Sequence, residues 1–197
     1  LIEAEDRPGY HATGRSVAFW TESYGGPEVQ PLTTASGADL RALGLLSVRG
    51  ALTLGRAGQE SRVKAFARTF TERGVRFDIE DREAIARRIP GLLPNWVIGA
   101  WEPDCSDIDV AALHQQLLAL SRRAGTDLWC NARLESAERA GGAWLLRMAG
   151  GREASCAVLV NAAGAWADPV AEMAGVRPLG IAPLRSEEHT SELQSPD

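Results

Sequence analysis

The residues best suited to chemistry lie near the start of the sequence. Glu3 directly follows the apolar pair Leu1-Ile2, which is typical of the end of a buried strand. In dinucleotide-binding folds an acidic residue at that place binds the ribose, because one carboxylate can accept hydrogen bonds from both ribose hydroxyls. The alternative for Glu3, taken alone, is an ordinary exposed acid.

A second polar segment, His11-Ala12-Thr13-Gly14-Arg15-Ser16, follows after a short loop that contains Pro8-Gly9. Its arginine and two hydroxyls suit a diphosphate and an electron-rich ring, and its glycine permits close approach of the backbone. Two alternatives stay open. Arg15 could serve a surface salt bridge, and His11 could be a solvated loop histidine.

Two later segments complete the pattern. Residues 102–110, Glu-Pro-Asp-Cys-Ser-Asp-Ile-Asp-Val, precede a long predicted helix, and residues 161–166, Asn-Ala-Ala-Gly-Ala-Trp, end an apolar run with small residues. Together with Glu3 and the first polar segment, they resemble the D-amino-acid oxidase-like family of FAD-dependent oxidoreductases. That family includes glycine oxidase-like and D-amino-acid dehydrogenase-like enzymes. The resemblance extends over residues 1–184.

The resemblance implies FAD as the cofactor. It assigns Glu3 to the ribose, the first polar segment to the pyrophosphate and flavin, and Leu134 to the start of a β-meander whose backbone recognises adenine. The small residues after the apolar run would let a strand end approach the cofactor. The predicted cofactor-binding residues are therefore Glu3, His11, Thr13, Gly14, Arg15, Ser16, Leu134, Ala162, Ala163, Gly164 and Trp166.

The implied fold is α/β, with a Rossmann-like FAD-binding domain and an interleaved α+β substrate domain. Residues 1–36 and 104–184 are assigned to the first domain, and residues 37–103 to the second. No G-x-G-x-x-G phosphate loop occurs in the 197 residues, so the FAD-binding domain is expected to be incomplete. We expect the chain to be an internal piece of a longer protein that is inactive by itself.

For the complete protein the resemblance implies oxidation of an amine or amino acid by hydride transfer to flavin N5, giving an imine that water hydrolyses. The flavin carries the chemistry, so no catalytic side chain is assigned. Tyr24 and His11 could approach a substrate, or could be packing and loop residues. The substrate, the electron acceptor, the oligomeric state and the choice between oxidase and dehydrogenase stay open. The alternatives are a nicotinamide-dependent Rossmann enzyme and a non-enzymatic binding module.

The composition of the chain limits the kinds of partner that we expect. The net charge is -5 and no basic cluster occurs, so nucleic acid is not expected as a partner. The three cysteines are far apart and not at metal-ligand spacing from the histidines, which predicts free thiols and no metal site. No apolar run is long enough to span a bilayer. We predict a cytoplasmic protein, or one peripheral to the inner face of a membrane if it is a dehydrogenase, although any targeting signal could have been lost.

Apolar periodicity predicts the supporting elements. Val110, Leu113, Leu117 and Leu120 form one apolar stripe of a long helix. Val158-Leu159-Val160 predicts a strand buried on both faces. The other expected elements are helices over Pro27–Leu43, around Val63–Phe70, over Asp81–Ile89 and over Trp166–Ala174; single strands over Leu45–Leu54, Val75–Ile79 and Trp96–Trp101; and a three-stranded meander from Leu134 to Val160.

The last residues differ from the rest. Residues 185–195 have no apolar period and match the translation of a widely used sequencing adaptor. We interpret residues 185–197 as a non-native tail whose removal leaves thermal stability unchanged. The alternative is a disordered polar C-terminus.

Overall fold

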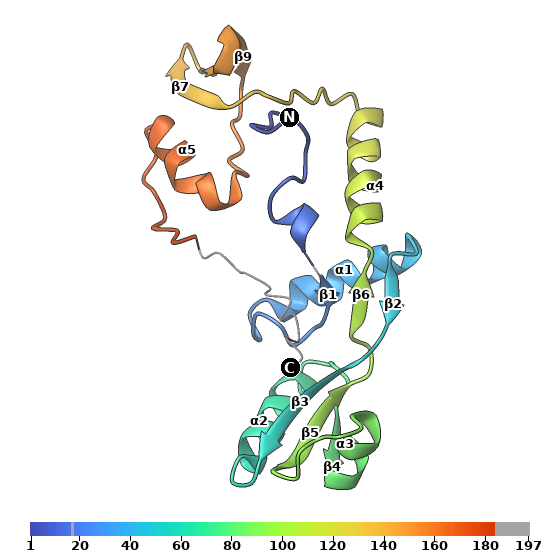
Figure 1. Cartoon of the computed structure of the whole chain (residues 1–197). Coiled ribbons are helices and arrows are strands. Elements are labelled where there is room, and N and C mark those ends of the chain that lie inside the picture. Colours follow the sequence, from blue (N-terminus) through green and yellow to red (C-terminus); the bar gives the residue numbers. More distant parts are fainter. Residues whose placement is uncertain (17, 184–197) are drawn as a thin grey trace, which may run out of the picture. The chain divides into compact units, whose positions relative to one another are not determined.

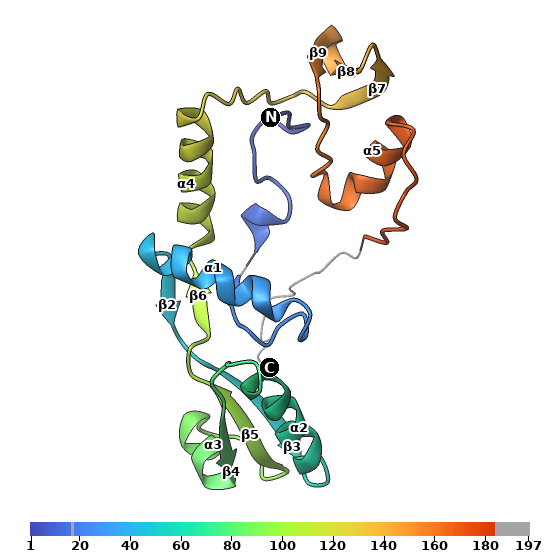
Figure 2. The same cartoon turned by 180° about the vertical axis from the view of Figure 1, so that it is seen from behind.

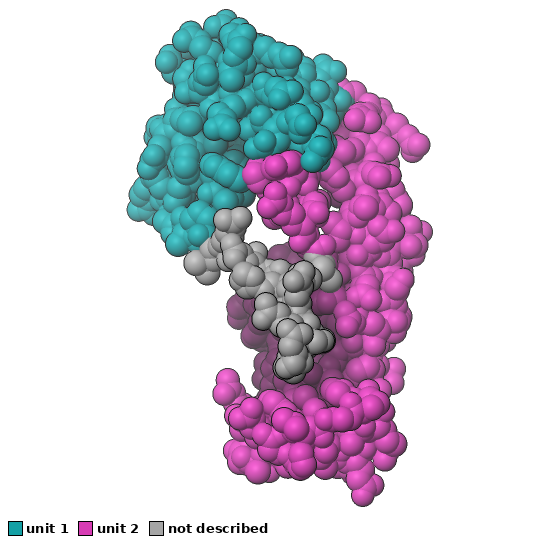
Figure 3. All heavy atoms as spheres, viewed as in Figure 1, with its two compact units in different colours: residues 1–8, 126–197 teal, residues 9–125 magenta. Residues whose placement is uncertain are grey.

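The computed structural model describes residues 1–16 and 18–183. The chain forms two compact units, one of Leu1–Pro8 with Thr126–Asp197 and one of Gly9–Gly125 (Figure 3). Each unit is described by itself below. The predicted non-native tail, residues 185–197, lies outside the described residues.

An antiparallel sheet with the strand order β3 (Ala51–Arg56), β5 (Trp96–Glu102), β4 (Asp78–Asp81) lies in the Gly9–Gly125 unit. Helices α2 (Glu60–Thr71) and α3 (Arg82–Arg88) flank this sheet (Figures 1 and 2). Ile98 of β5 packs with Val63 of α2, whereas a Cβ on the next residue, Gly99, would lie 2.7 Å from Ile85 of α3. Successive strand residues point to opposite faces, so the two helices cover opposite faces of the sheet.

A second antiparallel sheet of the same unit has the order β1 (Phe19–Trp20), β6 (Ser106–Ile108), β2 (Leu46–Val48). Helix α1 (Gln30–Ala42) packs against it through Leu40, which shares a buried cluster with Trp20 and Leu45. The Trp20 indole N–H donates to the Thr33 carbonyl at 2.8 Å, so the buried ring is both packed and hydrogen-bonded.

A single strand was expected over Leu45–Leu54, but the structure has β2 and β3 with a break at Arg49-Gly50. Gly50 has a φ of 73°, and a Cβ there would collide with the Trp101 ring. The backbone turns at this glycine because the indole occupies the space that a side chain would need. Val75 was expected to begin a strand. Instead its N–H donates to the Phe70 carbonyl at 3.1 Å behind the end of α2, and β4 begins only at Asp78.

Helix α4 (Val110–Arg123) begins at Asp109, whose carboxylate accepts from the Ala112 N–H at 2.9 Å. It ends before Gly125, which has a φ of 84°. The predicted apolar stripe is present, but no residue of α4 is fully buried, and Leu117 and Leu120 are 53% and 50% exposed. The helix is therefore confirmed, while its apolar face is only partly covered by the described residues.

The other unit contains a short parallel pairing between its first residues and residues 127–132. The Trp129 N–H donates to the Leu1 carbonyl at 2.9 Å, and the Glu3 N–H donates to the Trp129 carbonyl at 2.8 Å. Ile2 and Trp129 form a parallel bridge. This parallel pairing is the local arrangement that a Rossmann-like sheet requires.

The expected meander follows as β7 (Leu134–Ala140), β8 (Ala143–Met148) and β9 (Arg152–Cys156), with the strand order β7-β8-β9. A 3-10 turn, η2 (Ala149–Gly151), joins the last two strands. Ala132, Ala137, Leu146 and Met148 form the buried cluster of this unit, and Ile2, Leu134 and Leu159 pack against it.

The prediction of a buried strand over Val158–Val160 is wrong for the described structure. These residues have no strand conformation, and Val158 and Val160 are 73% and 78% exposed. An apolar run becomes a buried strand only where neighbouring strands pair with it, and β9 already ends at Cys156. The chain continues through η3 (Gly164–Trp166) into α5 (Ala167–Met173).

Among the described residues, no helix is long and apolar enough to cross a membrane. The two compact units divide the chain at residues 8 and 125. Compactness does not reveal which residues bind a cofactor. The assignment of residues 1–36 and 104–184 to cofactor binding therefore stays a prediction.

Candidate dinucleotide-binding site

Glu3 lies where the parallel pairing ends. Its carbonyl accepts from the Ala132 N–H at 2.8 Å, which fixes the backbone beside the meander. One carboxylate oxygen, Oε1, accepts from the Glu5 N–H at 3.0 Å. The other oxygen has no hydrogen bond within residues 1–16 and 18–183. The side chain is thus oriented by its own backbone and keeps one acceptor for a hydroxyl donor.

The first polar segment belongs to the Gly9–Gly125 unit and forms a tight loop there. A Cβ on Gly14 would collide with the Gly9 carbonyl oxygen, and a Cβ on Gly9 would lie 2.8 Å from the His114 ring on α4. Gly9 has a φ of 76°. Both glycines are therefore needed for the loop to close against itself and against α4.

The side chains of this loop face outward. Thr13, Gly14, Arg15 and Ser16 are exposed, whereas His11 is half-buried. The Arg15 guanidinium lies 5.4 Å from the centre of the Tyr10 ring, and the Tyr10 and His11 rings meet edge to face. Thr13–Arg15 form the 3-10 turn η1. The loop therefore presents polar side chains on a backbone that its two glycines allow to close, beside the edge-to-face pair of Tyr10 and His11.

Ser16 also lines an open hollow of about 530 Å³ at the start of α4. Within it, Arg49 forms an ion pair with Asp107 at 3.0 Å and lies over the Phe19 ring. Because Arg49 already has these partners, its charge is partly compensated. The other lining residues are Ala18, Ile108, Asp109, Val110 and Ala111.

Leu134 and the glycine turn lie in the Thr126–Asp197 unit with Glu3. Leu134 packs on the buried cluster and pairs with Met148, at the start of the edge strand β7. Ala162 and Gly164 are exposed, and Ala163 is half-buried. Gly164 has a φ of 55°, which a residue with a side chain adopts only with strain. Trp166 follows, with half its surface exposed.

The structure thus places the predicted residues in two sets. One set lies in the unit of Leu1–Pro8 with Thr126–Asp197 and consists of Glu3, Leu134, Ala162, Ala163, Gly164 and Trp166. The other lies in the Gly9–Gly125 unit and consists of His11, Thr13, Gly14, Arg15 and Ser16. Within the first set, Ile2 and Leu134 pack on one shared cluster. The joint binding of one cofactor by both sets stays a prediction.

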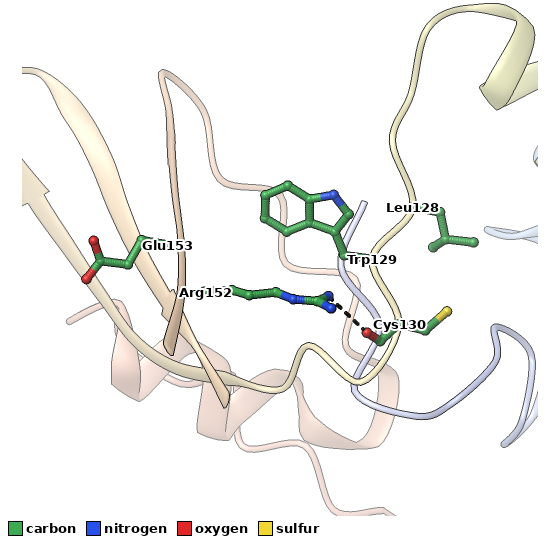
Figure 4. Close-up of a pocket in the computed structure, with 5 residues that line it drawn as sticks. All are labelled: Leu128, Trp129, Cys130, Arg152 and Glu153. Carbon is green, nitrogen blue, oxygen red and sulfur yellow. Dashed lines mark hydrogen bonds between the residues drawn. The ribbon is translucent and has the colours of Figure 1, made fainter. Parts of the chain in front are cut away.

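Another open hollow, of about 510 Å³, is lined by Leu128, Trp129 and Cys130 together with Arg152 and Glu153 of β9, and none of these is a predicted site residue (Figure 4). Trp129 uses its own N–H and carbonyl to pair with Leu1 and Glu3. The neighbouring Cys130 carbonyl instead accepts from Arg152 Nη1 at 3.3 Å (Figure 4). Arg152 therefore occupies a backbone acceptor that an exposed strand edge would otherwise present.

Sequence reasoning missed a buried carboxylate, Glu102, which is 2% exposed. Its Oε1 accepts from the Glu22 N–H at 2.8 Å, and its Oε2 accepts from the Thr21 and Ser23 hydroxyls at 3.0 and 2.6 Å. These bonds fix the turn that precedes Tyr24, whose side chain is 79% exposed. Glu102 begins the 102–110 segment noted in the sequence, but no local pattern marks it as buried, because its hydrogen-bond partners lie about eighty positions earlier in the chain.

The thiol of Cys105 lies in the same buried region and is 2% exposed. Burial raises the pKa of this thiol, and the negative charge of Glu102 raises the pKa further. A thiol with a raised pKa stays protonated and is a poor nucleophile or metal ligand. No group of three or more metal-ligating side chains occurs within the described part of the chain.

The strand-end acid, the glycine turn, the meander and the parallel pairing are the features expected of an α/β cofactor-binding fold. The chain belongs to the FAD dependent oxidoreductase (DAO) family, whose model matches residues 1–191. The resemblance found in the sequence is therefore confirmed, and FAD is the cofactor of this family.

Solved structures share the fold. L-α-glycerophosphate oxidase from Mycoplasma pneumoniae, determined with FAD bound, superposes with a TM-score of 0.79 at 12% identity over 89% of this chain and 50% of its own. Glycine oxidase from Geobacillus kaustophilus superposes with a TM-score of 0.76 at 16% identity, over 88% of this chain and 50% of its own. NikD, an amino acid oxidase of nikkomycin biosynthesis, superposes with a TM-score of 0.73 at 20% identity, over 87% of this chain and 46% of its own. The chain thus spans about half the length of each.

The residues present fit FAD. Glu3 keeps a carboxylate oxygen for a ribose hydroxyl, and β7 is an edge strand whose outer backbone groups can meet an adenine ring. The exposed Gly164 carries no side chain and has no atom within 4 Å of the place where a Cβ would lie, so its backbone is open to close approach by a cofactor.

Proposed function

We propose that the complete protein containing this chain oxidises an amine or an amino acid with FAD. FAD, when bound, would supply the hydride acceptor, flavin N5, for oxidation of the carbon that bears the nitrogen, and the resulting imine would be hydrolysed by water. The proposal is supported by the family and by fold neighbours whose names include glycine oxidase and an amino acid oxidase.

The observation that supports FAD as the cofactor is the geometry of Glu3. Its carboxylate stands at the end of a parallel strand pair, is oriented by the Glu5 N–H, and retains one acceptor oxygen. In the proposed complex this oxygen accepts from a ribose hydroxyl of FAD. Leu134 contributes backbone groups to adenine, and the exposed Arg15 and Ser16 contribute donors to the pyrophosphate and flavin.

The first test is made on the purified complete protein. We expect a yellow protein that releases FAD rather than FMN on denaturation, because Glu3 and Leu134 are assigned to the adenosine half. A colourless protein that binds a nicotinamide dinucleotide instead would overturn the proposal.

A matched pair of variants sharpens this test. Glu3→Gln leaves the shape of the side chain and removes its charge, and we expect about a tenfold weaker FAD affinity, roughly the effect of one hydrogen bond to a charged group. Glu172→Gln, at an exposed position on α5 outside the residues assigned to FAD, makes the same charge change and should leave FAD affinity unchanged.

The substrate part is tested by mixing the FAD-loaded protein with candidate substrates under nitrogen and following the loss of flavin absorbance. D-amino acids, L-amino acids and secondary amines form one group, and glycerol 3-phosphate represents the alcohols. Bleaching by a member of the first group supports C–N oxidation. Bleaching by glycerol 3-phosphate alone would overturn the substrate class while leaving the cofactor assignment intact.

A further inference from the structure

The turn of Ala162–Gly164 is held by the side chain just before it. The Asn161 Oδ1 accepts from the Ala163 N–H at 3.2 Å, and its Nδ2 donates to the Ala167 carbonyl at 2.8 Å. One amide group therefore connects the turn to the first residue of α5. An asparagine is suited to this because a single planar group carries both an acceptor and a donor.

The adjacent residue, Asp168, holds a second segment. Its Oδ1 accepts from the Leu179 N–H at 2.9 Å, and its Oδ2 accepts from the Gly180 and Ile181 N–H groups at 2.8 and 2.7 Å. Three successive N–H groups directed at one carboxylate form an anion-binding nest that is occupied by the protein itself. Hydrogen bonds of this charge-assisted kind are stronger than neutral ones.

The two sets of hydrogen bonds meet at neighbouring residues. Ala167, which Asn161 binds, and Asp168 both lie at the start of α5. The glycine turn and the Leu179–Ile181 segment are therefore connected through one short stretch of backbone. Neither Asn161 nor Asp168 is among the residues assigned to contact the cofactor.

We propose that Asn161 and Asp168 are positioning residues that hold the Ala162–Gly164 turn in its cofactor-binding form. This inference rests on the proposed function, because that turn is assigned to FAD. Asn161 acts on the turn directly, since it fixes the Ala163 N–H. Asp168 acts through the start of α5, because anchoring the Leu179–Ile181 segment there limits movement of the carbonyl that Asn161 binds.

The experiment measures the FAD dissociation constant of the complete protein by flavin fluorescence at a temperature well below unfolding. Asn161→Ala and Asp168→Asn are each expected to weaken FAD binding about tenfold, the size of one or two such hydrogen bonds. In Asp168→Asn, an NH₂ group replaces one carboxylate oxygen and faces N–H donors. Glu172→Gln is the control, since it makes the same charge change at an exposed position of α5.

The double variant tests whether the two residues act as one unit. If the two residues are coupled, the double variant loses about tenfold in FAD affinity, close to the loss in either single variant. If they act independently, the two losses in FAD affinity multiply to about a hundredfold. A hundredfold loss of FAD affinity in the double variant would show that Asn161 and Asp168 do not act as one unit. Equal FAD affinity in wild type, Asn161→Ala and Asp168→Asn would overturn the whole inference.

Two further measurements separate positioning from folding. Hydrogen exchange of the cofactor-free protein should speed up at Leu179–Ile181 in Asp168→Asn and stay unchanged in the meander; an unchanged rate at Leu179–Ile181 would contradict the role of Asp168. Asn161→Asp keeps the acceptor for Ala163 but places a charged oxygen against the Ala167 carbonyl, so it should also weaken FAD binding and serves as the test if Asn161→Ala does not fold. A wild type that binds no FAD refutes the proposed function, whereas a binding wild type with unaffected variants refutes only this inference.

Discussion

Helices α2 and α4 have similar amphipathic sequences but different surroundings. Helix α2 buries Val63, Ala67 and Phe70 to 5%, 4% and 3% exposure. Helix α4 has an equally regular apolar stripe, yet Leu117 and Leu120 keep about half of their surface exposed, at 53% and 50%. The difference comes from the partner. Sheet β3-β5-β4 lies against α2, whereas among the described residues α4 reaches a buried cluster only through its first part, at Ala112 and Leu113.

The same contrast separates the meander from the strand end that follows it. Met148 in β8 is fully buried, while Val158 and Val160, which are equally apolar, are 73% and 78% exposed. An apolar pattern therefore indicates which face of an element can be buried. Burial itself requires a second surface of matching shape.

The largest expected effect is at the core between α3 and β5. Ile85→Ala removes a side chain that is 0% exposed and should lower the free energy of unfolding by about 2–5 kcal/mol in urea titration. Leu117→Ala is the matched control on α4 and should cost under about 1 kcal/mol in the 197-residue chain. Equal losses at the two positions would show that α4 is covered as fully as α3.

The next effect concerns cofactor binding by the 197-residue chain alone. The chain contains no G-x-G-x-x-G, so it lacks the helix N-terminus that faces a pyrophosphate, and Leu1, Val158 and Val160 expose an apolar surface. We expect poor solubility, no turnover of amines, and FAD binding at least about a hundredfold weaker than in a longer protein that supplies this loop. Stoichiometric micromolar binding by the chain alone, followed by flavin fluorescence, would contradict this expectation.

A smaller effect is expected at the helix starts. Asp81 caps α3 through the Ala84 N–H at 2.9 Å, and Asp109 caps α4 through the Ala112 N–H at the same distance. Each Asp→Ala change removes one such bond and should cost about 1 kcal/mol in urea titration. Since α3 is packed and α4 is more exposed, Asp81→Ala should lower global stability, whereas Asp109→Ala should appear mainly as faster hydrogen exchange in α4. The reverse distribution would contradict the contrast between the two helices.

The smallest effect is a pH dependence at Cys105. The folded state raises the pKa of this thiol, chiefly by burial, so the folded state keeps its proton more tightly than the unfolded state. Stability from this group is therefore complete below the ordinary thiol pKa of about 8.5 and declines as the pH rises above it. Urea titrations at pH 7 and pH 10 should show a smaller decline in Cys105→Ala than in the wild type. An identical decline would mean that the thiol does not contribute.

The sequence by itself determined the main helices, the meander and the family. The positions of α2, α3 and α4 and the meander follow from local periodicity and turn signals. Glu3, the Gly14-Arg15-Ser16 segment and the Ala162–Gly164 turn followed from motif resemblance, and the family match confirms the family that these motifs indicated.

Only the tertiary structure decided which apolar faces are covered and which backbone breaks occur. Gly50 interrupts a predicted strand because the Trp101 ring, about fifty residues later, fills the space beside it. Glu102 fixes the turn at Thr21–Ser23, and Asp168 binds N–H groups more than ten residues away. Such contacts join residues that are remote in sequence, so no local pattern encodes them. They form only when the folded backbone brings a donor, an acceptor or an open space to the required position.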